Sequence, residues 1–168
     1  HSRSLDRALM VRDKTLSYEI GEYQYTVGNG RSSRTYYVNY VRIALSRNLP
    51  HILLDGKKNN ILGISTLPVM IDRDQKLSLE GGFDTHFTLY APQKYETDVL
   101  YIFTPDVMAT FMDCGEAIDA EIIDNELYLY TLKRLALVKP KNIEMFVRLA
   151  EVIGSRVEHQ ADYYMDET

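Results

Sequence analysis

The residues best suited to bind a ligand lie in one glycine-rich segment, where residues 28–34 read Gly-Asn-Gly-Arg-Ser-Ser-Arg. Guanidinium and hydroxyl groups bind phosphate oxygens through charge-assisted hydrogen bonds. The predicted ligands of a phosphate or a lipid headgroup are therefore Arg31, Ser32, Ser33 and Arg34. The segment lacks the Gly-Lys-Ser/Thr ending of a P-loop, and glycine and serine are also common at the tip of a hairpin. Both interpretations stay open.

Carboxylates gather in the C-terminal half, where no Lys or Arg lies between Lys94 and Lys133. The densest group is Asp119, Glu121, Asp124 and Glu126. Two carboxylates that converge in a pocket can act as general acid and base, so an enzyme is one hypothesis. The spacing does not fit the twelve-residue calcium loop of an EF-hand. We favour a solvated strand face, on which such charges contribute little to stability.

The remaining reactive side chains give weaker signals. Cys114 is the only cysteine, so the chain can form neither an internal disulfide nor a cysteine-rich zinc site. The neighbouring acids Asp113 and Glu116 disfavour its thiolate, and we expect this side chain to be inert. His86 shares a predicted strand face with Asp84, which is too little to define a site. We expect no metal and no cofactor.

Charge is unevenly distributed along the 168 residues. The formal net charge is −5, but residues 1–60 hold ten Lys/Arg and five Asp/Glu, whereas the remainder holds nine and nineteen. A basic half can face an anionic partner such as a membrane surface. The pI of about 5.4 argues against nucleic acid. Of the thirteen tyrosines, six lie between residues 18 and 40, and we expect them to pack across strands.

A mostly antiparallel sheet must position these residues. Runs rich in β-branched and aromatic side chains predict strands at 16–20, 23–27, 34–45, 51–54, 75–79, 83–89 and 99–103. The last of these is apolar throughout, which is typical of a strand buried on both faces. Residues 55–60 are predicted to form an exposed loop.

Two helices and a hairpin follow. Thr-Pro-Asp at 104–106 is a helix start signal, because it combines an N-cap, a proline in the first turn and an acid near the helix N-terminus. It predicts a helix at 104–114, and apolar residues at helical spacing predict another at 141–158. Between them, residues 118–123 and 126–131 predict a hairpin with a two-residue turn. Its register places Ile122 opposite Leu127 and Glu121 opposite Tyr128, and puts the acids on a solvated face.

We therefore expect an α+β fold, in which the two helices pack on a mostly antiparallel and strongly curled sheet. A partly closed barrel capped by the C-terminal helix, as in pleckstrin-homology-like domains, is the alternative. One domain is expected to span residues 1–160, followed by a frayed tail at 161–168.

Part of the chain resembles an uncharacterised bacterial family, known only as a domain of unknown function. The resemblance covers roughly residues 75–132 and rests on Leu-Glu-Gly-Gly-Phe at 79–83, His-Phe-Thr-Leu-Tyr at 86–90, Ile-Phe-Thr-Pro-Asp-Val-Met at 102–108 and Asn-Glu-Leu-Tyr-Leu-Tyr at 125–130. It implies a soluble domain on the cytoplasmic side, which a segment outside this chain tethers to the membrane in some members. The basic N-terminal third suits such a place. The family contributes no known catalytic or binding residues.

The function predicted from the sequence is a non-enzymatic interaction module of a bacterial protein, held near the inner membrane. Its expected partner is a protein or an anionic membrane surface. The first alternative is a phosphate or headgroup binder that uses residues 28–34. The second is an enzyme that uses the clustered carboxylates.

Overall fold

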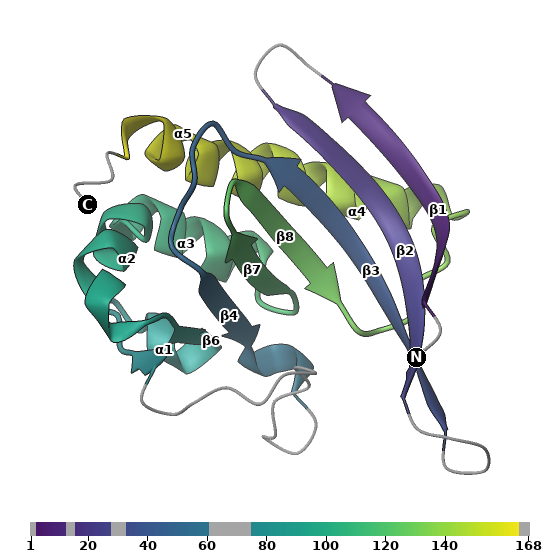
Figure 1. The fold of residues 1–168 in the computed structure, drawn as a ribbon, viewed down its shortest axis with the longest axis horizontal. Helices are drawn as coiled ribbons and strands as arrows, with labels where there is room; N and C mark the ends of the chain where they lie inside the picture. The colour runs from purple at the N-terminus through teal and green to yellow at the C-terminus, as the bar shows by residue number, and fades with distance from the viewer. Residues whose placement is uncertain (1–2, 13–15, 28–32, 61–74, 165–168) are drawn as a thin grey trace.

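The structure is a computed structural model, and it describes residues 3–12, 16–27, 33–60 and 75–164. Within these ranges the chain has the predicted α+β fold, built on one eight-stranded antiparallel sheet. The strands lie in the order β1-β2-β3-β8-β7-β4-β6-β5. The sheet does not close on itself, so the alternative of a pleckstrin-homology-like barrel is wrong. Figure 1 shows the helices gathered behind the sheet, against one of its faces.

The strands are β1 (Arg3–Arg12), β2 (Ser17–Val27), β3 (Arg34–Ala44), β4 (Ile52–Gly56), β5 (Lys76–Leu77), β6 (Phe87–Tyr90), β7 (Asp119–Ile123) and β8 (Glu126–Thr131). The α-helices are α1 (Phe83–His86), α2 (Glu96–Ile102), α3 (Pro105–Cys114), α4 (Pro140–Leu149) and α5 (Ser155–Tyr163). Short 3-10 turns lie at Lys57–Asn59 and Gln93–Tyr95. Helix α3 confirms the helix predicted at 104–114, and the helical residues 140–163 confirm the one predicted at 141–158, whereas α1 and α2 were not predicted.

The hairpin β7–β8 lies in the middle of the sheet, between β3 and β4. Its register is the predicted one, with Ile122 opposite Leu127 and Glu121 opposite Tyr128. Strand β8 pairs with β3, and β7 pairs with β4. The hairpin thus joins the N-terminal strands β1–β3 to the group formed by β4, β6 and β5.

The core fills the space between the sheet and the helices. Four phenylalanine rings pack against one another there: Phe83, Phe87, Phe103 and Phe111. Each of them is at most 3% exposed. Alternate apolar side chains of the central strands complete this core because one face of each strand points to the helices.

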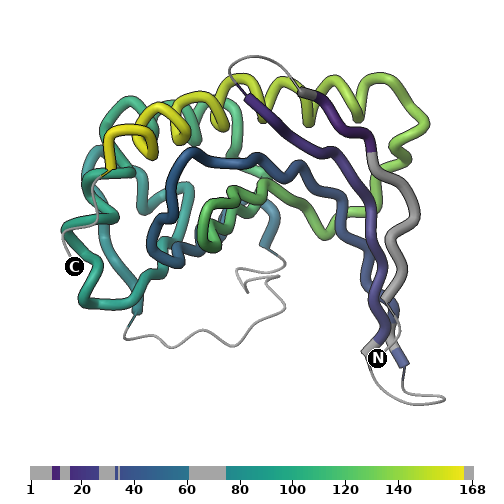
Figure 2. Tube along the Cα trace, turned by 45° about the horizontal axis from the view of Figure 1, so that its top comes forward, coloured from purple at the N-terminus to yellow at the C-terminus, as the bar shows by residue number. Residues whose placement is uncertain are grey.

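A π-helical turn at Ala150–Gly154 separates α4 from α5. A π turn holds an extra residue, and Phe146 before it and Val157 after it both reach the core. A Cβ on Gly154 would lie 2.7 Å from Ile43 Cδ1, so glycine allows the helix to lie close to β3. Figure 2 shows this helical segment running across one side of the strands.

The predicted strand at 99–103 is helical instead. In α2, Val99 and Ile102 are buried, whereas Leu100 and Tyr101 are 55% and 46% exposed. Burial at i and i+3 is the pattern of a helix with one buried side. The apolar run was therefore misread as continuously buried.

Three further expectations are corrected. Residues 83–86 of the predicted strand at 83–89 form α1, and only the rest is the strand β6. The expected strands at 16–20 and 23–27 are one strand, β2, and β1 was not predicted. Residues 161–164 are not frayed, because Ala161 and Tyr164 are buried. Among the described helices, each is too short or too polar to cross a bilayer.

Candidate functional site

The face of the sheet opposite the helices carries an array of tyrosines. Alternate residues of β2, β3 and β8 point to this face, and six of them are Tyr23, Tyr25, Tyr36, Tyr40, Tyr128 and Tyr130. Val38, Tyr40 and Tyr130 are buried at the centre of the array. They form a second apolar cluster, which the sheet separates from the main core.

The rings lie close enough to fix one another. Tyr36 stacks on Tyr25 with centroids 5.1 Å apart, and Tyr25 stacks on Tyr23 at 5.9 Å. Tyr23 meets Tyr40 edge-on at 6.2 Å, and Tyr40 lies 6.5 Å from Tyr128. These distances are typical of favourable aromatic pairs. The array therefore runs continuously from Tyr25 and Tyr36, near the end of the β2–β3 hairpin, to the central strand β8.

An open hollow of about 500 Å³ lies over this array. We call it the tyrosine hollow. Its lining is mostly apolar and consists of Glu19, Tyr23, Val38, Tyr40, Arg42, Glu121, Ile123, Tyr128, Tyr130 and Leu132. The volume is within the range of small-ligand sites, which is roughly 300–1,000 Å³, but the hollow is not enclosed.

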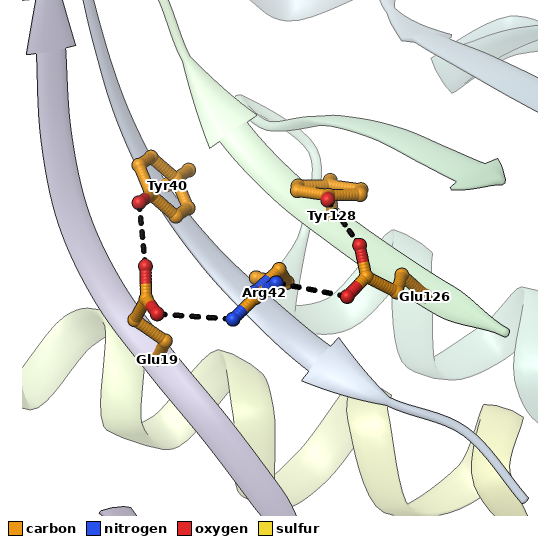
Figure 3. Close-up of polar contacts among 5 residues, drawn as sticks. All are labelled: Glu19, Tyr40, Arg42, Glu126 and Tyr128. Atoms are coloured by element: carbon orange, nitrogen blue, oxygen red, sulfur yellow. Dashed lines mark hydrogen bonds and ion pairs between the residues drawn. The ribbon is translucent and has the colours of Figure 1, made fainter. Parts of the chain in front are cut away.

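A charged network forms one side of the hollow (Figure 3). Arg42 lies between two carboxylates, with its nitrogens 3.0 Å from Glu19 and 2.9 Å from Glu126. The Tyr40 hydroxyl donates to Glu19 at 2.7 Å, and the Tyr128 hydroxyl donates to Glu126. Each carboxylate thus accepts from both the guanidinium and a tyrosine, which holds the two rings in place.

Three tyrosine hydroxyls of the hollow, those of Tyr40, Tyr128 and Tyr130, have a raised pKa and stay protonated at neutral pH. Burial, together with the hydrogen bond to Glu19, raises the pKa of Tyr40. Burial and the hydrogen bond to Glu126 raise the pKa of Tyr128 to about 12. Burial also raises the pKa of Tyr130. These groups are therefore hydrogen-bond donors and not bases.

A glycine makes room for the central ring. Gly21 lies directly opposite Tyr40 on the neighbouring strand. A Cβ at Gly21 would lie 2.5 Å from the Tyr40 hydroxyl oxygen and 2.6 Å from the adjoining ring carbon. The Tyr40 ring therefore covers the backbone of Gly21, and any larger residue would displace it.

Negative charge exceeds positive charge in and beside the hollow. Among the described side chains, Glu19 and Glu126 share the one guanidinium of Arg42, and Glu121 also lines the hollow. Glu121 pairs with His51, whose Nε2 lies 2.8 Å from the Glu121 carboxylate and whose side chain is 60% exposed. A surface that combines aromatic rings with excess carboxylate attracts cations through both features.

Beside the hollow, two aspartates are buried. Asp119 is 0% exposed and Asp55 is 2% exposed, which corrects the predictions that Asp119 faces solvent and that Asp55 belongs to an exposed loop. Burial, more than the nearby charge of Asp55, raises the pKa of Asp119 to about 6. The Asp119 carboxylate accepts a hydrogen bond of 3.0 Å from the Gly56 backbone N–H.

The other acids predicted from the sequence separate into different environments. Glu121 and Glu126 reach the hollow or its network. Asp124 lies in the hairpin turn with a φ of 53°, and its backbone carbonyl accepts from Leu49. The four acids therefore do not converge on one point.

The predicted phosphate ligands are not placed at the hollow. Arg31 and Ser32 lie outside the described residues. Ser33 is exposed. Arg34 begins β3 opposite Val27, in the last residue pair of the β2–β3 hairpin. No geometry of the described residues bears on phosphate binding by this segment.

The predicted reactive side chains lie elsewhere. His86 ends α1, with Nδ1 2.7 Å from Glu116, and Glu116 also pairs with Lys58. The ion pairs with Lys58 and His86 lower the pKa of Glu116. Cys114 is half-buried at the end of α3. In the described part of the chain, no three His, Cys, Asp or Glu side chains are placed to hold a metal ion.

Glu19, Gly21 and Arg42 were not predicted from the sequence. Their signal was the register of the β2–β3 hairpin, which sets Glu19 opposite Arg42 and Gly21 opposite Tyr40. The division of β2 into two predicted strands at Gly21 hid this register.

Comparison with known proteins adds no relative: no protein-family model, no curated protein and no solved structure matches this chain.

Proposed function

We propose that this chain is a binding module, which uses the tyrosine hollow to hold a lysine- or arginine-bearing segment of a partner protein. The observation that carries the proposal is the combination of buried and half-buried tyrosine rings, which line an open hollow, with excess carboxylate on the sheet face opposite the helices. Tyrosine is enriched in protein interfaces and at their energetic centres.

The chemistry of the partner follows from the charges. Among the described side chains of the hollow and its network, the three carboxylates of Glu19, Glu121 and Glu126 outnumber the guanidinium of Arg42, and Glu121 also pairs with His51. An anionic lipid surface or nucleic acid would be repelled at this face, whereas a basic side chain gains Coulomb attraction. A lysine or arginine over a tyrosine ring adds about 0.5–2 kcal/mol, depending on desolvation.

The shape favours a protein segment over a small molecule. Ligand pockets bury most of their ligand's surface, whereas this hollow is open along the sheet. One or two side chains of a partner would fill it while the rest of that partner lies over the neighbouring strands. The network around Arg42 fixes the rings in advance, which reduces the ordering cost of association.

The site favours binding over catalysis. The Tyr40 and Tyr128 hydroxyls already donate hydrogen bonds to the carboxylates of Glu19 and Glu126. Asp119 is the acid whose pKa is raised to about 6, but it has no exposed surface, so a substrate in the hollow could not reach it. General acid–base catalysis requires such contact.

Selection of random peptides displayed on phage tests the proposal, with the chain immobilised as the target. We expect enriched peptides to carry Lys or Arg beside aromatic or aliphatic residues. The affinity of the best peptide, measured by isothermal titration calorimetry, should fall about fivefold in Glu121→Gln, because one charge contact of ~1 kcal/mol is lost.

Two further variants locate the binding. Tyr128→Ala should reduce the affinity at least tenfold, because it removes a ring that lines the hollow. Glu144→Gln is the matched control, since Glu144 is exposed on α4 against the opposite face. The proposal is refuted if no peptide is enriched, if the enriched peptides lack positive charge, or if both hollow variants bind them as tightly as the original chain.

A further inference from the structure

The connection from β8 to the start of α4 carries a group of positive charges. Residues 133–141 read Lys-Arg-Leu-Ala-Leu-Val-Lys-Pro-Lys, and no Asp or Glu lies between Glu126 and Glu144. We call residues 133–141 the basic segment. Its Lys and Arg side chains are all exposed. None of them belongs to an ion pair with a described residue, although the Arg134 guanidinium lies over the Tyr37 ring, 4.1 Å from its centroid.

Packing and hydrogen bonds hold the basic segment in one shape. Leu137 is only 9% exposed and belongs to the main core. The Leu135 N–H donates to Asn39 Oδ1 at 2.8 Å, and the Ala136 carbonyl accepts from the Lys139 N–H at 3.0 Å. A segment that is already ordered loses less conformational entropy when it binds.

The apolar side chain that this packing leaves outside lies among the cations. Val138, which precedes Lys139, is 66% exposed. The tyrosine hollow is lined mostly by apolar side chains and has an excess of carboxylates over the guanidinium of Arg42. An exposed aliphatic side chain flanked by cations therefore has both properties that the hollow would select.

The hollow and the basic segment adjoin in the chain but do not fill each other on one molecule. Leu132 lines the hollow, and the segment starts at the next residue. The ion pairs of the carboxylates in the hollow and its network are formed with Arg42 and His51, and the segment takes no part in them. Each molecule thus carries two surfaces of opposite charge, which can be satisfied twice in a two-fold dimer.

We propose that the segment held in the tyrosine hollow is the basic segment of a second copy of this chain. This inference rests on the proposed function of the hollow and names its partner. In a two-fold arrangement each copy lays its segment over the hollow of the other. An anionic membrane would attract the segment but would be repelled by the carboxylates beside it, whereas a second copy complements both charges.

Sedimentation equilibrium of the full chain tests the proposal, at about 50 mM NaCl and over roughly 1–300 µM protein. The weight-average mass should rise with concentration from the 19.4 kDa of one chain toward twice that mass. Raising the NaCl concentration to about 500 mM should weaken the association at least fivefold, because salt screens exposed charges.

Two charge-reversal variants locate the contact. Glu121→Lys changes the hollow, and the double variant Lys139→Glu/Lys141→Glu changes the segment. Each variant alone should self-associate at least tenfold more weakly than the original chain. An equimolar mixture of the two should associate more strongly than either, because the unchanged segment of one variant then meets the unchanged hollow of the other.

The matched control is the double variant Lys76→Glu/Lys94→Glu. Both lysines are exposed, and Lys76 lies in β5, at the opposite edge of the sheet from β1. This variant should self-associate as the original chain does. If Glu121→Lys does not fold, Tyr128→Ala takes its place in the mixture, since Tyr128 also lines the hollow.

Three results would overturn the proposal. The first is a mass that stays at 19.4 kDa at every concentration; if such a monomer still binds selected basic peptides at the hollow, the proposed function stands without this inference, and if it binds none, both fall. The second is a mixture that associates no more than its components. The third is a monomeric chain that sediments with vesicles containing about 30% phosphatidylglycerol but not after Lys139→Glu/Lys141→Glu, which would assign the segment to a membrane surface.

Discussion

Replacement of Asp119 by asparagine should make the protein more stable at neutral pH. The variant keeps an oxygen that can accept from the Gly56 N–H but removes a buried charge. Burial raises the pKa of Asp119 from 3.8 to about 6. A difference of one pKa unit corresponds to about 1.4 kcal/mol, so the ionised carboxylate costs the folded state about 3 kcal/mol.

The sign of the pH dependence follows from proton binding. Between pH 3.8 and about 6, the folded state binds the Asp119 proton more tightly than the unfolded state does. The free energy of unfolding therefore falls as the pH rises through this window. The stabilisation by the proton is complete below the unfolded pKa and is lost above the folded one.

Urea unfolding, followed by far-UV circular dichroism, measures the effect. The difference in unfolding free energy between Asp119→Asn and the original chain should grow in favour of the variant by up to about 3 kcal/mol from about pH 4 to about pH 7. Other titrating groups contribute to both proteins and cancel in this difference. If the difference in unfolding free energy were the same at about pH 4 and about pH 7, the folded state would not bury an ionised Asp119 carboxylate, and the reasoning would be refuted.

Three further substitutions test the packing, each measured by urea unfolding. Gly21→Ala places a Cβ 2.5 Å from the Tyr40 hydroxyl, so it should destabilise the chain by about 1–3 kcal/mol and weaken peptide binding to the hollow; unchanged stability and binding would contradict this. Gly154→Ala should be neutral or destabilising, because the new Cβ would lie 2.7 Å from Ile43 Cδ1. In an Ile43→Val background, which lacks that atom, the same change should stabilise the chain by up to ~1 kcal/mol, since alanine favours helix over glycine. Phe111→Ala, at a ring 1% exposed, should cost about 3–5 kcal/mol, and a much smaller loss would mean that the core refills the space.

The parts of the fold that local patterns define were predictable. The hairpin β7–β8 has the predicted register because its two strands and the Asp124-Asn125 turn adjoin in sequence. Helix α3 begins with the predicted cap, in which the Thr104 hydroxyl accepts from the Val107 N–H. Both depend on interactions within a few residues, which the sequence displays directly.

The errors arose where burial depends on distant segments. Residues 99–103 form an unbroken apolar run, but Leu100 and Tyr101 are exposed in α2. Only the contact of α2 with the rest of the fold decides which side of this run is buried. The acids in its first turn, Glu96 and Asp98, were the available helix signal.

The same reason explains what was missed at the site. Asp119 alternates with apolar residues as a solvated strand residue would, and its burial follows from the pairing of β7 with β4. These two strands are more than sixty positions apart in the chain. The tyrosine hollow likewise combines strands from both ends of the sequence, β2 and β3 with β7 and β8, so no local pattern outlines it.

The central position of the β7–β8 hairpin also determines when the tyrosine hollow is complete during synthesis of the chain. Strands β1–β3 and β4 leave the ribosome earlier, but the two positions between them in the sheet are filled only by residues 119–131. Until then the tyrosines of β2 and β3 have no neighbours on β8, and Glu121 and Glu126 have not been translated. An unfinished chain therefore presents half of the hollow without the carboxylates of the hairpin, and the basic partner that we propose would meet the full set of carboxylates only on a molecule whose sheet is complete.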